Sequence, residues 1–221
     1  MNLALVPARS GSKSIKNKNI KLFLKKPLIY WTLLSLEKSS VIDKIYLATD
    51  SKKIINIANK FKFKKLRIFI RSKFSSRDNA QTEEVLLEFL KKKKIKDSNH
   101  LFLVQPTSPY INSNDYNKAL KKLKNSKNNS LLSAVKSKNF FWTTNGKAIN
   151  YDYKKRPRRQ NNKGIFVENG AFYLNTVKNI LRSKNRLTKP IAIYEMSNKS
   201  LLELDEREDW ALAEYIKKKF F

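Results

Sequence analysis

The feature that most constrains the fold of this chain is a regular alternation of short apolar runs with amphipathic stretches. It begins with the apolar run Leu3–Val6 and continues with a helical segment at Pro27–Lys38, which carries proline in its first turn. Strands that alternate with helices are typical of a mostly parallel central sheet with helices on both faces. We therefore expect an α/β fold.

The alternation persists along the chain. The expected strands are Lys44–Thr49, Leu66–Ile70, Leu101–Val104, Leu131–Val135, Gly170–Leu174 and Ile191–Met196; the expected helices are Ser51–Phe61, Thr82–Lys93, a polar helix before Leu131, and Glu208–Lys219. Thr82 is a plausible helix cap, because its hydroxyl can accept a hydrogen bond from the first turn. Glu83 and Glu84 follow it, where the helix dipole favours acids.

The pattern breaks between Asn139 and Ile165, where aromatic residues, asparagines and arginines replace the alternation. This segment is interpreted as an excursion from the core, and a β-rich arm is one form that it could take. No internal repeat and no Pro/Gly/Ser linker marks a second domain. The expected organisation is one domain over residues 1–221, with the arm at 139–165 inserted in it.

Composition excludes several classes of protein. The chain has no cysteine, so disulfides, thiolate metal sites and a cysteine nucleophile are absent, which fits a reducing intracellular setting. The apolar start is too short for a signal peptide, and no later run approaches about 18 apolar residues. We expect a cytoplasmic protein with no membrane partner.

The net charge of +30, from 48 Lys+Arg against 18 Asp+Glu, would ordinarily suggest nucleic acid or an anionic membrane surface as a partner. Most of the basic residues are lysine, however, and lysine, asparagine and isoleucine share A/T-rich codons. Genome composition can therefore account for much of this surface. A basic nucleic-acid-binding protein stays an alternative, although nucleic acid is the less favoured partner.

The loop after the first strand is the first candidate site. It reads VPARSGSKSIKNKNIKLF, residues 6–23, and ligands bind beyond the carboxyl ends of strands in α/β sheets. Gly11 permits close backbone approach, the serines offer hydroxyls, and Arg9, Lys13 and Lys18 supply positive charge suited to a triphosphate. The loop is neither GxxxxGK[ST] nor GxGxxG. A solvated basic loop is the alternative.

An acidic segment, SLLELDEREDW at residues 200–210, is the second candidate. In an extended chain Glu203 and Asp205 face one side and would repel each other unless a cation lies between them. Together with a phosphate-binding loop, this predicts a magnesium ion shared by carboxylates and phosphate oxygens. The alternative is a helix start, in which acids interact favourably with the helix dipole.

A third candidate is the cluster of Arg156, Arg158 and Arg159 beside Tyr151 and Tyr153. Arginine is scarce in this chain, so codon composition does not explain the cluster. Guanidinium groups with aromatic neighbours suit nucleic-acid contact, and they suit an acidic small molecule equally well, because arginine binds a carboxylate in a bidentate fork.

Two kinds of active site have no support in the sequence. The only histidine, His100, stands at the entry to the strand at Leu101–Val104, and no cluster of histidines with metal-ligand spacing exists. No GxSxG motif supports a serine hydrolase either.

These motifs, in this order, resemble the acylneuraminate cytidylyltransferases, which make CMP-sialic acid and related CMP-nonulosonates. The matching segments are PARSGSKSIKNKNI, KPLIYWTL, IDKIYLATDS, the region of Arg71 and Asp78, LVQPTSPY, RPRRQ, ENGAFYL and LELDEREDW, so the resemblance covers essentially the whole chain. It implies a nucleotide-diphospho-sugar transferase type of fold, CTP as substrate, magnesium, and a homodimer. The segment at 139–165 would be the dimerisation arm, completing the neighbour's site.

The resemblance also implies roles for individual residues. It places Arg9, Gly11, Ser12, Lys13 and Lys18 at the triphosphate, Asn19, Arg71, Ala80 and Thr82 around the cytidine, Gln105 and Pro106 near the sugar, and Arg158, Arg159, Gln160 and Asn169 at the acidic sugar. Glu203 and Asp205 would hold magnesium, and Arg9, Lys13 and Asp205 would carry catalysis.

The chain departs from the family pattern at three positions. Ser10 and Ser14 stand where glycines are usual, and a serine would be strained there if the backbone required positive φ. Glu203 replaces the first aspartate of a DxD motif, while Asp205 keeps the second. The related Kdo enzymes begin with a different loop.

The expected reaction is attack by the anomeric hydroxyl of a nine-carbon keto-acid sugar on the α-phosphorus of CTP, which gives a CMP-sugar and pyrophosphate. Positioning and charge neutralisation would supply most of the rate. A Kdo-activating enzyme, or one that uses another nucleotide base, is the alternative with the same fold. The sequence does not distinguish sialic, legionaminic and pseudaminic acids, because a few pocket contacts read their differences.

Overall fold

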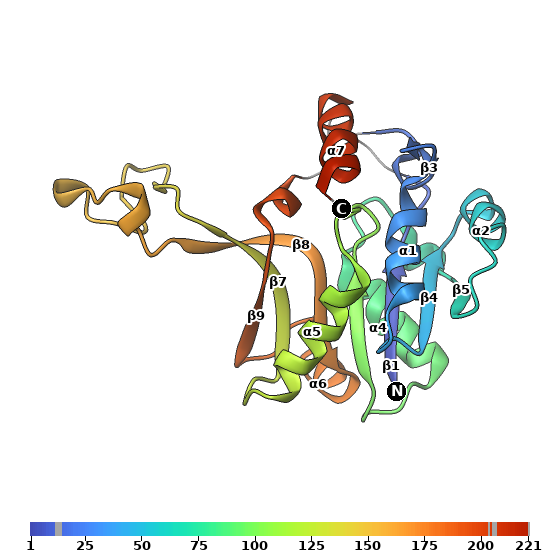
Figure 1. Cartoon of the computed structure of the whole chain (residues 1–221). Coiled ribbons are helices and arrows are strands. Elements are labelled where there is room, and N and C mark those ends of the chain that lie inside the picture. Colours follow the sequence, from blue (N-terminus) through green and yellow to red (C-terminus); the bar gives the residue numbers. More distant parts are fainter. Residues whose placement is uncertain (12–14, 203, 205–206, 221) are drawn as a thin grey trace.

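A seven-stranded sheet forms the centre of the protein, in the order β5-β4-β1-β6-β8-β7-β9 (Figure 1). The computed structural model describes residues 1–11, 15–202, 204 and 207–220. The strands are β1 (Asn2–Pro7), β4 (Lys44–Thr49), β5 (Leu66–Ile70), β6 (His100–Val104), β7 (Ser130–Ser137), β8 (Ile165–Thr176) and β9 (Ile191–Met196), and a small ribbon joins β2 (Leu22–Phe23) to β3 (Lys26–Pro27). Every strand expected from the sequence is present.

The sheet is mostly parallel, as the sequence predicts. Strand β1 pairs in parallel with β4 and β6, and β4 with β5; β7 pairs in parallel with β9. Strand β8 runs antiparallel to both β6 and β7. This one reversed strand joins the two parallel groups, and the period of the sequence does not reveal its direction.

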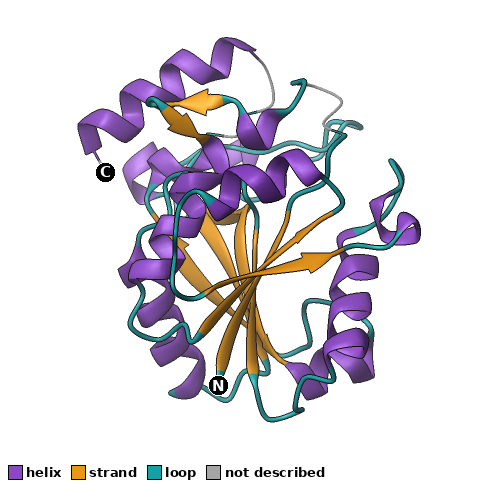
Figure 2. Ribbon diagram, turned by 90° about the vertical axis from the view of Figure 1, so that its right-hand side faces the viewer, coloured by secondary structure: helices purple, strands orange, loops and turns teal. Residues whose placement is uncertain are grey.

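Helices cover both faces of the sheet (Figure 2). They are α1 (Leu28–Lys38), α2 (Lys52–Asn59), α3 (Lys73–Ser76), α4 (Thr82–Lys93), α5 (Ser113–Lys124), α6 (Val177–Ser183) and α7 (Arg207–Phe220). One core cluster joins α1, α2 and α5 to the sheet, and a second joins α4 and α6 to it. In the described part of the chain, no helix has the length and apolarity needed to cross a membrane.

The start of α4 differs from the expectation in one respect. Gln81, with φ −73° and ψ 154°, is the N-cap and makes no capping hydrogen bond through its side chain, whereas Thr82 is already the first helical residue. The prediction that Thr82 caps this helix is therefore wrong. Glu83 and Glu84 do occupy the first turn, and three lysines occupy the last, so the charges complement the helix dipole as expected.

Helix α7 packs against the segment that follows the first loop. Trp210 donates a hydrogen bond from Nε1 to the carbonyl of Leu22 at 2.9 Å, and Glu214 accepts one from the backbone N–H of Leu24 at 2.7 Å. Leu24 and Lys25 form the tight turn of the β2–β3 ribbon with φ of 47° and 63°. Side chains disfavour this left-handed region, and the two hydrogen bonds from α7 lie on either side of Phe23, directly before this turn.

The segment at 139–165 leaves the body of the protein beyond the ends of β7 and β8 (Figure 1). In its described residues it contains short 3₁₀ turns at Tyr153–Lys155 and Arg159–Asn161 and an isolated bridge between Trp142 and Ala148. The arm is therefore an excursion from the core, as expected, but it is not β-rich. Aromatic contacts take the place of strand pairing: the ring of Trp142 lies 5.8 Å from that of Tyr151.

The burial of Lys217 on α7 predicts how the stability of the protein depends on pH. Burial lowers its pKa to about 8, although the charge of Asp115 opposes the shift, and its ammonium lies 5.7 Å from the ring centroid of Trp31. Between pH 8 and the ordinary lysine pKa of about 10.4, the folded state therefore binds fewer protons than the unfolded state. The contribution of Lys217 to the free energy of unfolding thus rises as the pH rises through that window.

Lys217→Met is expected to be more stable than the parent chain at pH 7.5, because the buried charge is removed, and its advantage should shrink by pH 9.5. Urea unfolding of both proteins at the two pH values measures this difference. An advantage that stays constant between the two pH values would show that Lys217 keeps its ordinary pKa.

Candidate active site

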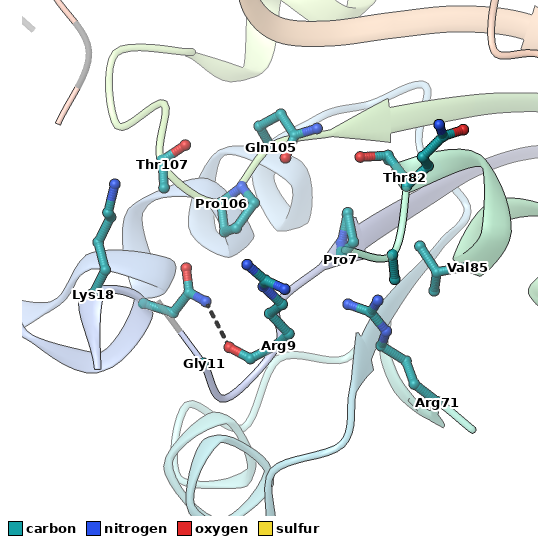
Figure 3. Close-up of a pocket in the computed structure, with 13 residues that line it drawn as sticks. Pro7, Arg9, Gly11, Lys18, Arg71, Thr82, Val85, Gln105, Pro106 and Thr107 are labelled. Atoms are coloured by element: carbon teal, nitrogen blue, oxygen red, sulfur yellow. Dashed lines mark hydrogen bonds between the residues drawn. The ribbon is translucent and has the colours of Figure 1, made fainter. Parts of the chain in front are cut away.

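A polar cavity beside the first loop lies at the carboxyl ends of the central strands, as expected for an α/β sheet. It has a volume of about 460 Å³ (Figure 3). Its lining residues are Pro7, Arg9, Gly11, Lys18, Asn19, Arg71, Ala80, Gln81, Thr82, Val85, Gln105, Pro106 and Thr107. Every described residue that the sequence places at the nucleotide is in this set, together with Gln105 and Pro106.

The lining of this cavity is positively charged. Arg9, Lys18 and Arg71 contribute cations, and among the described lining residues there is no carboxylate. Arg71 is 8% exposed, and its burial lowers its pKa, while the charge of Asp50 opposes this effect and that of Arg9 adds to it. Two guanidinium groups facing one cavity (Figure 3) repel each other, so the arrangement favours an anionic ligand.

Arg9 is held by the segment that leads to α4. Its Nη1 donates to the carbonyls of Arg77 and Asp78 at 3.0 and 2.9 Å, and it lies 3.5 Å from Oδ1 of Asp78. The carboxylate of Asp78 is 66% exposed, and an ion pair of this kind contributes little to stability. The backbone contacts aim the guanidinium, while the loose ion pair leaves it available for a phosphate.

The end of the first loop is ordered around Asn17, whose φ of 57° lies in the left-handed region that asparagine tolerates. This turn starts the 3₁₀ helix Lys18–Ile20, in which Lys18 and Asn19 are buried. Asn19 donates to the carbonyl of Arg9 at 3.3 Å. Its Oδ1 and the Nε of Arg71 are buried without hydrogen-bond partners in the described residues, and such atoms are few in native structures.

Ser10 does not have the strained backbone that replacement of a glycine would suggest. It is not among the described residues with positive φ. Instead its N–H and hydroxyl both donate to the carboxylate of Asp50, at 3.0 and 2.7 Å. The serine thus ties the loop to the end of β4, a contact that glycine could make only through its N–H. Ser14 lies outside the described residues.

A second cavity, of about 250 Å³, adjoins the first and shares Gln105 and Thr107 with it. Its other lining residues are Ser108, Asn169, Gly170, Tyr173, Ser200, Leu202 and Leu204. Asn169 is fixed in place, because its Oδ1 accepts from Ser133 at 2.8 Å and its Nδ2 donates to Ser200 at 3.1 Å. Two adjoining polar cavities can hold two substrates with their reacting groups in contact.

The remaining predicted site residues are elsewhere. Ser12, Lys13, Glu203 and Asp205 lie outside the described residues. Arg158, Arg159 and Gln160 are on the arm, and within the described chain they line neither cavity. Arg159 instead lines a separate basic cavity with Lys136, Lys138, Glu195 and Asn198. The described residues contain no group of three or more side chains able to bind a metal.

Several lining residues were not predicted from the sequence: Pro7, Gln81, Val85, Thr107, Ser108, Gly170, Tyr173, Ser200, Leu202 and Leu204. For Thr107 and Ser108 a signal existed, since they follow the strand at Leu101–Val104 in a loop at the carboxyl end of the sheet. For Tyr173 the residue pattern contained no such signal, because it lies inside an apolar strand segment that is typical of the core.

The fold and the paired cavities define an α/β protein with a cationic cavity at the carboxyl ends of its strands and a second polar cavity beside it. The structure resembles that of CMP:2-keto-3-deoxy-manno-octonic acid synthetase complexed with CTP, with a TM-score of 0.73 and 14% identity over 100% of this chain and 99% of that one. It also resembles 4-diphosphocytidyl-2C-methyl-D-erythritol synthase from Anaerococcus prevotii, with a TM-score of 0.70 and 15% identity over 99% of this chain and 98% of that one. Because the sequence identities are only 14% and 15%, these similarities establish the fold of the chain.

The chain belongs to the cytidylyltransferase family, whose sequence model matches residues 3–219. It is 34% identical to N-acylneuraminate cytidylyltransferase B of Danio rerio over 96% of this chain and 50% of that protein. It is 28% identical to pseudaminic acid cytidylyltransferase of Campylobacter jejuni over 98% of this chain and 96% of that protein. The resemblance expected from the sequence is confirmed. The chain spans about half the length of the vertebrate relatives it matches.

Proposed function

We propose that this protein transfers CMP from CTP to the anomeric hydroxyl of a nonulosonic acid, with release of pyrophosphate. The observation that carries the proposal is the cavity at the carboxyl ends of the strands, which is lined by Arg9, Lys18 and Arg71 and by no described carboxylate. Membership of the cytidylyltransferase family supports CTP as the anion. Relatives named for acylneuraminate and pseudaminic acid support the acidic sugar.

In this proposal the first cavity holds the nucleotide. Arg9 and Lys18 neutralise the triphosphate, and Lys13 and Ser12 of the same loop contribute to this. Asn19 and Arg71, whose Oδ1 and Nε have no partner in the described part of the chain, lie beside the cytidine together with Ala80 and Thr82. The cationic groups stabilise charge that develops on the departing pyrophosphate.

The sugar occupies the second cavity, where Asn169 is held rigidly and Gln105 faces both cavities. The sugar hydroxyl forms a bond to the α-phosphorus while the bond to the pyrophosphate oxygen breaks, and the hydroxyl proton leaves to solvent or to the product. Gln105 and Pro106, between the two cavities, position the reacting groups.

Arg158, Arg159 and Gln160 reach a sugar only in an assembly, since in this chain they line neither cavity. We infer a homodimer in which the arm at 139–165 completes the site of the neighbour, within a single domain over residues 1–221. Exposed aromatic side chains support this: Trp142 is 48% and Tyr153 is 59% exposed. An assembly that buries them would gain free energy from removal of apolar surface.

Magnesium suits the proposed reaction, and the residues present fit it. Leu202 and Leu204, the described neighbours of Glu203, line the second cavity, and carboxylates are the oxygen ligands that Mg²⁺ prefers. Glu203 and Asp205 would hold the ion. When bound, it would offset phosphate charge.

The chain's lack of cysteine is consistent with a reducing compartment, and we place the reaction in the cytoplasm.

The test is pyrophosphate release from each of the four common nucleoside triphosphates, with sialic, legionaminic, pseudaminic and Kdo sugars as acceptors and with magnesium present. Turnover with CTP and one nonulosonic acid is expected to exceed that with any other nucleotide by at least about 10-fold, because a site that hydrogen-bonds one base rejects others.

Two other outcomes would contradict the proposal. Preference for Kdo would indicate the related activity that the fold also supports. Absence of turnover together with RNA or DNA binding that weakens steeply with salt would indicate a nucleic-acid-binding protein.

A further inference from the structure

Glu83 and Arg186 form a two-point ion pair that neither cavity includes. Nε of Arg186 donates to one carboxylate oxygen of Glu83 at 2.6 Å, and Nη2 donates to the other at 2.7 Å. Both side chains are largely shielded from solvent: that of Arg186 is 22% exposed and that of Glu83 is 18% exposed. Bidentate pairs of this kind fix the orientation of both partners as well as their distance.

The position of each partner relates this pair to both cavities. Glu83 lies in the first turn of α4, directly after Thr82, which lines the first cavity. The guanidinium of Arg186 stacks on the ring of Tyr173, 4.9 Å from its centroid, and Tyr173 lines the second cavity. The hydroxyl of Tyr173 donates to Glu168. A continuous set of contacts thus runs from one cavity wall to the other.

Arg186 is itself anchored to the sheet. Its carbonyl accepts a hydrogen bond from Nδ2 of Asn175 on β8 at 3.1 Å, and Asn175 is 1% exposed. The neighbouring Leu187 packs against the core cluster beneath α4 and α6. The guanidinium therefore extends from a fixed backbone, so that it can hold α4 in place.

The charges reinforce this geometry. The hydrogen bond from Arg186 holds the pKa of Glu83 below its ordinary value, and the same bond raises the pKa of Arg186. Both shifts favour the charged forms of the two groups, in which the pair is strongest.

We propose that Arg186 and Glu83 are positioning residues that set the wall of the nucleotide cavity, at Ala80–Thr82, against the Tyr173 wall of the second cavity. This inference rests on the proposed function. Transfer requires the α-phosphorus and the sugar hydroxyl to lie within bonding reach, and a displacement of about 1 Å can reduce the rate as much as 100-fold. Loss of the pair would let α4 shift while each cavity keeps its own lining.

The test compares Arg186→Gln, Glu83→Gln and the double variant with the parent enzyme at 20 °C. The expected result is a turnover number reduced about 10- to 100-fold at saturating CTP and sugar, with CTP affinity by calorimetry changed less than the turnover number. The double variant should be no slower than the slower single variant, because either change alone breaks the pair. Arg186→Lys should recover only part of the rate, since lysine cannot make the fork.

Lys92→Gln is the matched control. Like Arg186→Gln it removes one positive charge, and it breaks an ion pair of α4, the one between Lys92 and Glu88, 2.6 Å apart, neither of which lines either cavity. It should leave turnover unchanged.

Reduced melting temperatures with turnover equal to that of Lys92→Gln would overturn the inference, because the pair would then stabilise the fold alone. Effects of Arg186→Gln and Glu83→Gln that multiply in the double variant would overturn it as well. A parent enzyme that binds no CTP and releases no pyrophosphate would refute the proposed function instead, and the two failures are therefore distinguishable.

Discussion

Arg9→Ala is expected to lower turnover about 100- to 1,000-fold, the usual effect of removing a fixed group that stabilises charge in the transition state. Arg9 lies in the cationic cavity, and its hydrogen bonds to the carbonyls of Arg77 and Asp78 aim the guanidinium there. Alanine removes the charge without opening a space in the core, since the side chain is 28% exposed. The measurement is pyrophosphate release at saturating CTP and sugar.

Arg67→Ala is the matched control for this prediction. Arg67 also donates to backbone carbonyls, those of Lys64 and Leu66 at 2.8 and 2.7 Å, and it stands on β5 away from the cavity lining. The melting temperatures of the two variants should be similar. Equal turnover in the two variants would mean that Arg9 is only a structural contact between the loop and the segment before α4.

Asp205→Ala is expected to abolish pyrophosphate release while the protein stays folded. Asp205 keeps the second position of the acidic pair that the sequence assigns to magnesium, and without a carboxylate the charge of the triphosphate would not be offset. Pyrophosphate release across a magnesium titration, with circular dichroism of the same sample, checks both parts of this expectation.

Asp97→Ala serves as the control for loss of one carboxylate. Asp97 is exposed between α4 and β6, and its backbone carbonyl, which accepts from the N–H of Lys178 at 3.1 Å, is kept in the variant. Turnover of Asp205→Ala equal to that of Asp97→Ala would refute the assignment of Asp205 as the main metal ligand.

Much of the fold could be predicted because the period of apolar residues is a local property. The run at Lys44–Thr49 and the helix at Thr82–Lys93 have the bounds expected from the sequence. Boundaries that depend on neighbours were less predictable. Strand β8 spans Ile165–Thr176, well beyond the expected Gly170–Leu174, because its first half pairs with β7 past an irregularity between Leu132 and Ala134.

For the first cavity, the position of Arg9 followed from its place after β1, whereas Arg71 and Gln105 were implied by the family resemblance. The fold explains why the three line one cavity, because loops that follow parallel strands meet at one edge of the sheet. The second cavity was not predictable from the residues alone. Tyr173 reaches the second cavity because β8 runs antiparallel to its neighbours.

By itself, the sequence determined the α/β class, the charged loop after β1 and the place where the arm begins, since each depends on residue type and local spacing. Only the tertiary structure decided the direction of β8, the adjacency of the two cavities and the pairing of Glu83 with Arg186. These partners are 103 positions apart, and contacts across such a separation follow from the packing of α4 and α6 in one core cluster, which no local pattern encodes.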